Sequence, residues 1–292
     1  MTGHTHDGVD WPARLVALRR ADQTQTAELR TVAERLVSAT CEQPTVLDIG
    51  SGAGGMSVAL ASELDKRGGG TLILVDAVPE LLDAATSAAR AAANGAVRVR
   101  PVLADVAKEP LRDLVPPADL IWAARVVHHL PDQRHGLDQL VGALAPGGWL
   151  ALAEGGLETR CLPWDIGIGA PGLQDRLAAA RAEWFASMRA DMPDSTRLPV
   201  GWNIALAEAG LGEVSAFSYL IDHPAPISRV VADSVMDWLR WLGDVSVDKV
   251  SDEDTETVRR LLDPDDPAYV GSRQDVFLLQ TLTVHLGRAA WH

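Results

Sequence analysis

The chain has 292 residues, 47% of them hydrophobic, and a formal net charge of −14 at pH 7. Its mean hydropathy is +0.03, and no apolar run approaches the roughly 18 residues of a membrane span, so we expect no membrane partner. The negative charge repels phosphate backbones, which disfavours a nucleic-acid partner. The polar N-terminus lacks the apolar core of a signal peptide, so we expect a cytoplasmic protein.

The first half of the chain predicts an α/β fold. Residues 11–39 show helical spacing of apolar side chains and predict one helix. Short apolar runs then alternate with helical stretches. The expected strands are 45–49, 71–75, 97–103, 120–123 and 149–153, with helices at 56–66 and 79–93 among them. Continuous apolar runs are typical of parallel strands buried on both faces, so the pattern indicates a doubly wound sheet.

The second half is less regular. It predicts helices at 173–190 and 201–209, strands at 214–221 and 276–286, and another amphipathic helix between those strands. We expect one domain that carries helical insertions. The expected parts are an N-terminal helical cap (1–40), a core (41–221) with an insertion at about 160–195, a helical lid (222–275), and a final strand and tail (276–292).

A glycine-rich loop follows the first strand. Gly50, Gly52, Gly54 and Gly55 lie between an apolar strand and a helix, where glycine lets the backbone turn tightly and approach a ligand. The N-terminus of the next helix offers unpaired N–H groups to an anion. The spacing matches both the dinucleotide fingerprint and the methyltransferase one, so the loop alone leaves the cofactor open.

Acidic residues at successive strand ends distinguish the two cofactors. Asp48 precedes the first glycine by two positions, where dinucleotide loops usually have an apolar or small residue. Asp76 and Asp105 close the next two strands at similar intervals. Each of these aspartates alone is also explained as a helix N-cap, but three in regular phase favour a ligand site.

With these residues the chain resembles the class I S-adenosylmethionine (SAM)-dependent methyltransferases, in particular their bacterial small-molecule branch of natural-product type. The resemblance is strong over residues 40–155 and weaker over the last two strands. It rests also on His128-His129-Leu130-Pro131-Asp132 and on Ala145-Pro146-Gly147-Gly148, which we expect to form a turn before the fifth strand. It implies a Rossmann-like sheet of seven strands, mostly parallel with the last one antiparallel, and SAM as cofactor.

The resemblance also implies roles for individual residues. The loop with Gly50, Gly52 and Gly54 would pack against the methionine part of SAM. Asp76 would accept hydrogen bonds from the ribose hydroxyls, and Asp105 from the adenine amino group. The remaining expected cofactor residues are Asp48, which would orient the loop or meet the cofactor's amino group, Val78 and Val106 as walls for adenine, and Arg125, where the family often has Asn.

Candidate catalytic residues follow the fourth and fifth strands, because ligands of open α/β sheets bind beyond the carboxyl ends of the strands. His128 and His129 are candidate bases, since neutral imidazole titrates near physiological pH. A packing or capping role for at least one of them is the alternative. Glu154 is a candidate base or a ligand for a substrate amine, with a solvated acid as the alternative.

Tryptophan dominates the aromatic residues, with nine Trp against two Tyr and three Phe. Trp stacks on flat rings and donates one hydrogen bond, so we expect a small aromatic acceptor of natural-product type bound by Trp164, Trp202 and Trp241. We assign Trp184 and Trp238 to the core of the insertions. C-methylation of an indole-like ring, O-methylation and N-methylation all stay open.

Two rival functions remain at this point. An NAD-dependent oxidoreductase would use the same glycine loop, but Asp48 and the lack of a Tyr-x-x-x-Lys pair oppose it. A non-catalytic or non-methylating relative that keeps SAM binding is the second alternative. Neither the histidines nor the two distant cysteines, Cys41 and Cys161, predict a metal site. The protein is expected to be a monomer or a homodimer.

Overall fold

The computed structural model describes residues 10–291, and the first nine residues of the expected N-terminal cap lie outside the described part. The chain divides into two compact units. The first comprises the described part of residues 1–156, residues 192–219 and the described part of 282–292; the second comprises 157–191 and 220–281. The segments expected as insertion and lid fall largely in the second unit.

The strands and helices of the first unit alternate along the chain as the apolar pattern predicts. The strands are β1 (Thr45–Ile49), β2 (Gly70–Asp76), β3 (Val97–Leu103), β4 (Ala118–Ala124) and β5 (Leu144–Ala153), joined late in the chain by β6 (Gly212–His223) and β7 (Leu278–Arg288), which both run on into the second unit. The helices are α1 (Trp11–Thr24), α2 (Thr26–Val37), α3 (Gly55–Lys66), α4 (Pro79–Ala92), α5 (Leu111–Leu114), α6 (Gln133–Gly142) and α8 (Trp202–Glu208), with a 3-10 turn η1 (Val127–His129).

The sheet has seven strands in the order β3-β2-β1-β4-β5-β7-β6. Neighbours from β3 to β5 pair in parallel, and β7 pairs antiparallel with β5, for example Leu152 with His285. This confirms the expected Rossmann-like fold. The strand order reverses between β1 and β4, and in such sheets the crevice at the reversal is where ligands bind.

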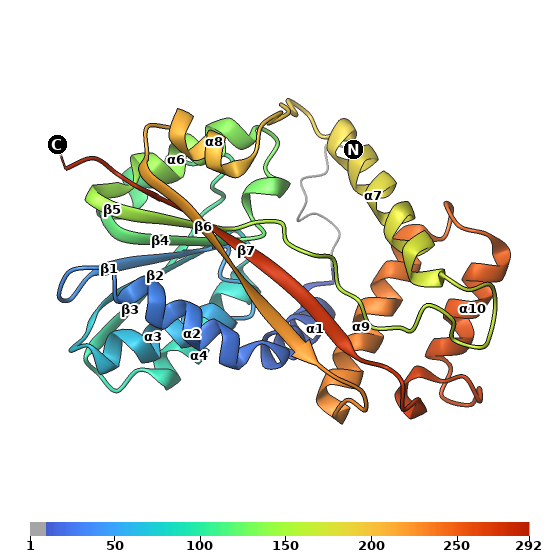
Figure 1. The fold of residues 1–292 in the computed structure, drawn as a ribbon. Helices are drawn as coiled ribbons and strands as arrows, with labels where there is room; N and C mark the ends of the chain where they lie inside the picture. Colours follow the sequence, from blue (N-terminus) through green and yellow to red (C-terminus); the bar gives the residue numbers. More distant parts are fainter. Residues whose placement is uncertain (1–9, 292) are drawn as a thin grey trace. The chain divides into compact units, whose positions relative to one another are not determined.

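Two apolar layers hold the sheet between its helices. Successive side chains of a strand point to opposite faces. Accordingly, Val46 packs with α2, α3 and α4, whereas Leu47 packs on the face covered by α5, α6 and α8 (Figure 1). Burial on both faces explains why these strands are continuously apolar in sequence.

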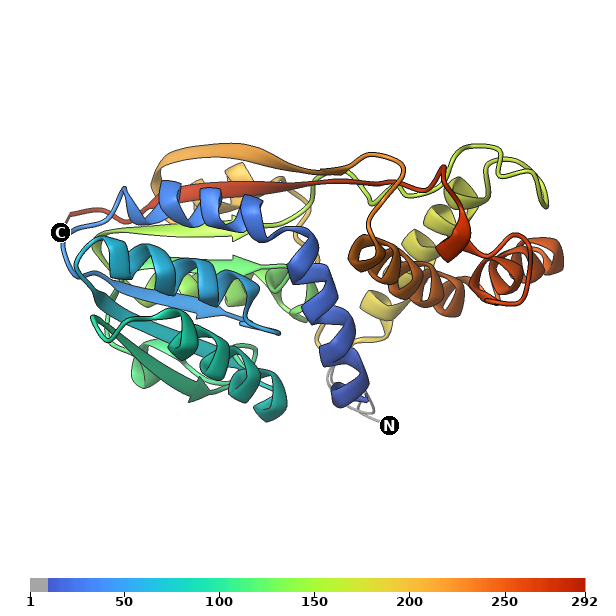
Figure 2. The ribbon, with the colours of Figure 1, turned by 90° about the horizontal axis from the view of Figure 1, so that it is seen from below.

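Two local expectations are wrong. The single helix expected over 11–39 is two helices, because Gln25 adopts φ −127° and ψ 17° and α1 turns away from α2 (Figure 2). The hydroxyls of Thr24 and Thr26 bond to the carbonyls of Ala21 and Asp22, a side-chain competition that disfavours a continuous helix. The turn expected at 145–148 lies inside β5, where Gly147 has φ +75° and the pairing with β4 is irregular.

The second unit is helical apart from the ends of β6 and β7. It contains α7 (Leu173–Asp191), α9 (Arg229–Ser246), α10 (Asp252–Leu262) and the 3-10 turn η2 (Val270–Ser272). On α9 the buried residues Val231, Val235, Leu239 and Leu242 recur at helical spacing, as the sequence predicts. Arg176 of α7 donates two hydrogen bonds, of 2.9 and 2.7 Å, to the carboxylate of Asp254, the third residue of α10.

Candidate functional site

The glycine loop connects the end of β1 to the first residue of α3. Gly50, Gly52 and Gly54 have φ of +65°, +55° and +96°, which glycine adopts without the steric cost that other residues bear. A Cβ on Gly50 would lie 2.4 Å from Cγ2 of Val126, so the loop also packs closely against the segment after β4. Gly52 has open space beside it, since the nearest atom to a Cβ there would be 3.9 Å away.

Asp76 links the end of β2 to this loop. Its Oδ2 accepts a hydrogen bond of 3.0 Å from the Gly52 N–H, and its Oδ1 accepts one of 3.0 Å from the Val78 N–H. These bonds fix the carboxylate at the carboxyl edge of the sheet. Because each carboxylate oxygen has a second lone pair, the group can also accept from ligand hydroxyls.

Asp48 lies beneath the loop and is 2% exposed. Its Oδ2 accepts a 2.5 Å hydrogen bond from the hydroxyl of Ser57 on α3, so Asp48 ties β1 to the helix that follows the loop. Burial raises the pKa of Asp48 to about 7, with smaller upward contributions from the nearby carboxylates of Asp76 and Asp22 and an opposing one from the hydrogen bond of Ser57. The contact with Ser57 agrees with a role for Asp48 in orienting the loop.

Asp105 follows β3 and closes a tight turn. Its Oδ1 accepts a 3.0 Å hydrogen bond from the Ala107 N–H, and its Oδ2 lies 3.0 Å from Nζ of Lys108. Val78 and Val106 are both buried, at the start of α4 and just after Asp105. The contacts of Asp105 are those of a local turn, and its role toward adenine, like that of the two valines, stays a prediction.

Asp22 of α1 reaches the same loop, which sequence reasoning did not predict. Its Oδ2 accepts a 2.9 Å hydrogen bond from the N–H of Gly55, the first residue of α3. Burial raises the pKa of Asp22 to about 6, while the Gly55 N–H and the charge of Arg125 act to lower it. Arg125 follows β4 with φ +56°, and its charge also acts on Tyr219 of β6. No local pattern marks Asp22, because α1 meets α3 through a contact between distant residues.

Glu154 and His128 form a second group, just past β5 and β4. Glu154 is 2% exposed, and its Oε1 accepts hydrogen bonds from the Val126 and Val127 N–H groups at 3.1 and 2.9 Å. Its Oε2 lies 2.5 Å from Nδ1 of His128. The alternative of a solvated acid is therefore wrong for Glu154, because both of its carboxylate oxygens bond inside the protein, and its role as a base or amine ligand stays a prediction.

Two more histidines border this group. The ring of His129 lies next to that of His128, with centroids 4.0 Å apart. His285 of β7 places Nε2 3.2 Å from the backbone oxygen of Glu154, and burial lowers the pKa of His285. The antiparallel pairing of β7 with β5 brings His285 here, and the sequence carries no local signal for that contact.

The three predicted pocket tryptophans fall in different parts of the molecule. Trp202 begins α8 in the first unit and packs against the apolar layer on its face of the sheet. Trp164 and Trp241 belong to the second unit, where Trp164 is 70% exposed. Trp241 lies beside Trp184 and Trp238, with ring centroids 5.9 and 5.0 Å apart. Their binding role stays a prediction.

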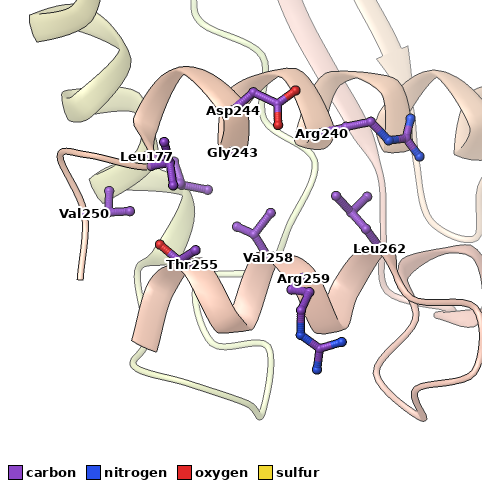
Figure 3. Close-up of a pocket in the computed structure, with 10 residues that line it drawn as sticks. Leu177, Arg240, Gly243, Asp244, Val250, Thr255, Val258, Arg259 and Leu262 are labelled. Carbon is purple, nitrogen blue, oxygen red and sulfur yellow. The ribbon is translucent and has the colours of Figure 1, made fainter. Parts of the chain in front are cut away.

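A groove of about 310 Å³ lies within the second unit, between α9 and α10 (Figure 3). Leu177, Val258 and Leu262 are its apolar walls, and Arg240 and Arg259 stand at its rim. Both arginines are paired with carboxylates of their own helices, Asp237 and Glu256. None of the predicted site residues lines this groove.

Within residues 10–291, no three His, Cys, Asp or Glu side chains gather closely enough to hold a metal ion. In the same part of the chain, every helix is too short or too polar to cross a bilayer.

Comparisons with known proteins identify the central segment. Residues 47–150 match a family model described as a methyltransferase domain. Among solved structures, the chain is similar to a proposed methyltransferase from Bacillus halodurans C-125 (16% identity, TM-score 0.48, 91% of this chain and 98% of that one covered). It is also similar to the YcgJ protein from Bacillus subtilis (18%, 0.47, 90% and 99%) and to a SAM-dependent methyltransferase from Thiobacillus denitrificans in complex with S-adenosyl-L-homocysteine (18%, 0.44, 88% and 90%).

The charges at the loop fit SAM better than a dinucleotide. The carboxylates of Asp22 and Asp76 both act on Asp48 there, and a ligand with a cationic sulfonium would relieve this repulsion, whereas a pyrophosphate would add to it. The hydroxyl of Ser51 is buried and makes no hydrogen bond among the described residues, so a polar ligand group at the loop would satisfy it. Residues 47–150 thus match a methyltransferase domain, and such a domain implies SAM as the methyl donor.

Proposed function

We propose that this methyltransferase acts on a small, aromatic acceptor of natural-product type, with His128 as the base. The observation that carries the proposal is the pairing of His128 with buried Glu154. Both residues follow strand ends at the edge where the glycine loop lies. Such a pair supports an acceptor that must lose a proton during methylation.

Glu154 acts on His128 as a positioning residue. Two hydrogen bonds from backbone N–H groups fix its carboxylate, and a third, to Nδ1 of His128, fixes the orientation of the imidazole ring. With Nδ1 facing Glu154, Nε2 is the nitrogen that exchanges a proton with the acceptor, and the carboxylate stabilises the imidazolium that forms.

SAM supplies, when bound, a methyl group on a sulfonium that leaves as a neutral thioether. The protein's contribution is then to align the acceptor and to hold its departing proton. Hydroxyl and amine acceptors release that proton directly, so the His128–Glu154 pair favours O- or N-methylation. An indole-like carbon acceptor also loses a proton after methylation and stays an alternative.

An aromatic acceptor is supported by the grouping of Trp241 with Trp184 and Trp238 in the second unit. Stacked aromatic side chains present flat apolar faces suited to a planar ligand. We assign Trp241 to acceptor binding on this ground and keep Trp164 and Trp202 as separate candidates, each judged by its own variant. Replacing Trp241 with Ala should raise the KM for an aromatic acceptor more than it lowers kcat, and the Ala variants of Trp164 and Trp202 are measured in the same way. Unchanged KM in all three variants would contradict an aromatic site.

The experiment for this function measures S-adenosylhomocysteine formation from SAM with panels of phenols, indoles and amines. For the acceptor that turns over, His128→Asn should lower kcat by about 10²- to 10⁴-fold, the usual contribution of a general base, with unchanged affinity for S-adenosylhomocysteine. Glu154→Gln should also lower kcat, by a smaller factor. Full activity of His128→Asn would contradict the base assignment. Binding of S-adenosylhomocysteine without turnover of any acceptor would favour a non-catalytic relative.

A further inference from the structure

Helix α3 receives its N-terminal cap from another helix. Its N-cap residue is Gly54, which has no side chain to accept a hydrogen bond from the first turn. Asp22 of α1, 33 positions earlier, accepts the Gly55 N–H at 2.9 Å instead. A carboxylate from the N-terminal segment thus lies at the positive end of α3, directly beside the glycine loop.

This contact depends on glycine at position 55. A Cβ there would lie 2.4 Å from Cγ of Asp22 and 2.7 Å from each of its carboxylate oxygens. The absence of a side chain at position 55 therefore leaves room for the Asp22 carboxylate beside the loop. This close contact explains why glycine stands there although its φ is one that any residue can adopt.

A cation accompanies this carboxylate. Arg125 follows β4, the strand that pairs with β1 on the side away from β2, and directly precedes Val126, whose Cγ2 would lie 2.4 Å from a Cβ on Gly50 of the loop. The charge of Arg125 also acts to lower the pKa of Asp22 on α1 and of Tyr219 on β6. A guanidinium has five N–H donors, so Arg125 can serve several acceptors at once. The loop is therefore bordered by an anion from α1 and a cation from the end of β4.

The order of the strands places different chemistry along this edge. Asp105 follows β3 and Asp76 ends β2, where uncharged hydroxyl and amino groups suit a carboxylate acceptor. Asp22 and Arg125 stand beside β1 and β4. SAM has the same polarity, with an uncharged adenosine at one end and an α-amino acid at the other.

We propose that Asp22 and Arg125 together bind the α-amino-acid end of SAM, Asp22 receiving the ammonium group and Arg125 the carboxylate. The inference rests on SAM as cofactor and is independent of the acceptor. Opposite charges on two separate elements recognise a zwitterion by charge-assisted hydrogen bonds. The N-terminal helix thereby takes part in cofactor recognition, and its contribution is specific to the amino group.

The test uses calorimetric binding of four ligands to the full chain. They are S-adenosylhomocysteine, its decarboxylated analogue, its deaminated analogue, and 5′-methylthioadenosine, which lacks the whole amino-acid end. With wild type, removal of either the amino group or the carboxylate should weaken binding by about tenfold or more. This comparison needs no variant and therefore does not depend on folding of a mutant.

Variants then assign each charge. Asp22→Asn keeps an oxygen for the Gly55 N–H but removes the charge, so it should weaken binding of S-adenosylhomocysteine and of the decarboxylated analogue by about tenfold, and not that of the deaminated analogue. Arg125→Gln should show the reverse pattern. Neither variant should alter binding of 5′-methylthioadenosine. Asp83→Asn, an exposed residue of α4, is the charge-matched control and should bind all four ligands like wild type.

Equal weakening of all four ligands by Asp22→Asn would show that Asp22 only caps α3 and would overturn the proposal. Unchanged binding of all four by both variants would overturn it as well. Failure of wild type to bind S-adenosylhomocysteine is a different result, since it would contradict SAM as the cofactor.

Discussion

Asp48 is a buried carboxyl group whose ionisation costs free energy in the folded state. Its pKa is about 7 when folded, against an ordinary 3.8, so its protonated form favours folding. The contribution of Asp48 to stability is therefore greatest below about pH 4 and is lost as the pH rises from about 4 to about 7. The groups that act on it are Ser57 of α3, which lowers the pKa, and the carboxylates of Asp76 and Asp22, which raise it.

Replacement of Asp48 by Asn should remove much of this pH dependence. We compare the free energy of unfolding of Asp48→Asn with that of wild type at two pH values. The variant's value minus the wild-type value should be larger at pH 8 than at pH 5 by about 3 kcal/mol. Any effect of the amide side chain on the free energy of unfolding that does not depend on pH cancels in this comparison. Urea unfolding of both proteins at the two pH values measures it, and a difference that does not change with pH would contradict the burial argument.

Individual site residues were predictable where the signal is local. Asp48, Gly50 and Asp76 stand at fixed intervals around a strand and a turn, so their types and spacing predict their neighbourhood. Asp22 and His285 were missed because α1 and β7 reach the site only through contacts between distant residues. Glu154 was placed at the site, but its burial depends on the backbone after β4, which no local pattern specifies.

The glycine loop has a conformation that side chains oppose. At Gly50, Ala would pay about 1–2 kcal/mol for φ +65° and would also place its Cβ against Val126. Gly50→Ala should therefore lower the free energy of unfolding by about 2 kcal/mol or more and weaken binding of S-adenosylhomocysteine. Gly142→Ala, at the end of α6 with open space around it, is the matched control and should be neutral or stabilising. Similar losses in both variants would contradict the argument.

In the second unit, α7 and α10 are joined by an ion pair whose carboxylate is buried and whose guanidinium is partly exposed. The Asp254 side chain is 4% exposed, and Arg176 holds the pKa of its carboxyl below 3.8, so the pair contributes stability at pH 7 that is lost as the pH falls below about 4. Arg176→Ala removes the main hydrogen-bond partner of this buried carboxylate and should cost about 1–3 kcal/mol. Arg259→Ala breaks only exposed pairs, with Glu256 and Asp263, and should cost clearly less than Arg176→Ala.

Urea unfolding followed by tryptophan fluorescence measures this difference, because Trp184, Trp238 and Trp241 belong to the same unit. Equal effects of the Arg176 and Arg259 variants at pH 7 would contradict a special role for the buried pair.

Helices and strands were predictable from the sequence where the spacing of apolar residues defines them. The parallel strands were placed from continuous apolar runs, and α9 from its apolar stripe. The break at Gln25 was missed, because the apolar spacing continues through it while the hydroxyls of Thr24 and Thr26 take backbone carbonyls. The start of β5 was also missed, since Pro146 and Gly147 are typical of turns and pair only irregularly here.

At the scale of the whole molecule, the net charge of −14 and the carboxylates at the glycine loop have the same consequence. Both favour a cationic cofactor over one with a pyrophosphate. The order of the strands aligns the ends of β3, β2, β1 and β4 along one edge, so residues distant in sequence meet there. The pattern of acids at strand ends predicted this edge, whereas the second unit's role toward an acceptor has no such pattern and stays a proposal.

The central claim is that the loop and Asp76 bind SAM, and calorimetry with S-adenosylhomocysteine and NADH tests it most directly. Wild type should bind S-adenosylhomocysteine and not NADH. Asp76→Ala should weaken that binding by about tenfold or more, since a charge-assisted acceptor for the ribose is lost. Binding of NADH, or no binding of S-adenosylhomocysteine by wild type, would contradict the assignment of this edge as a SAM site.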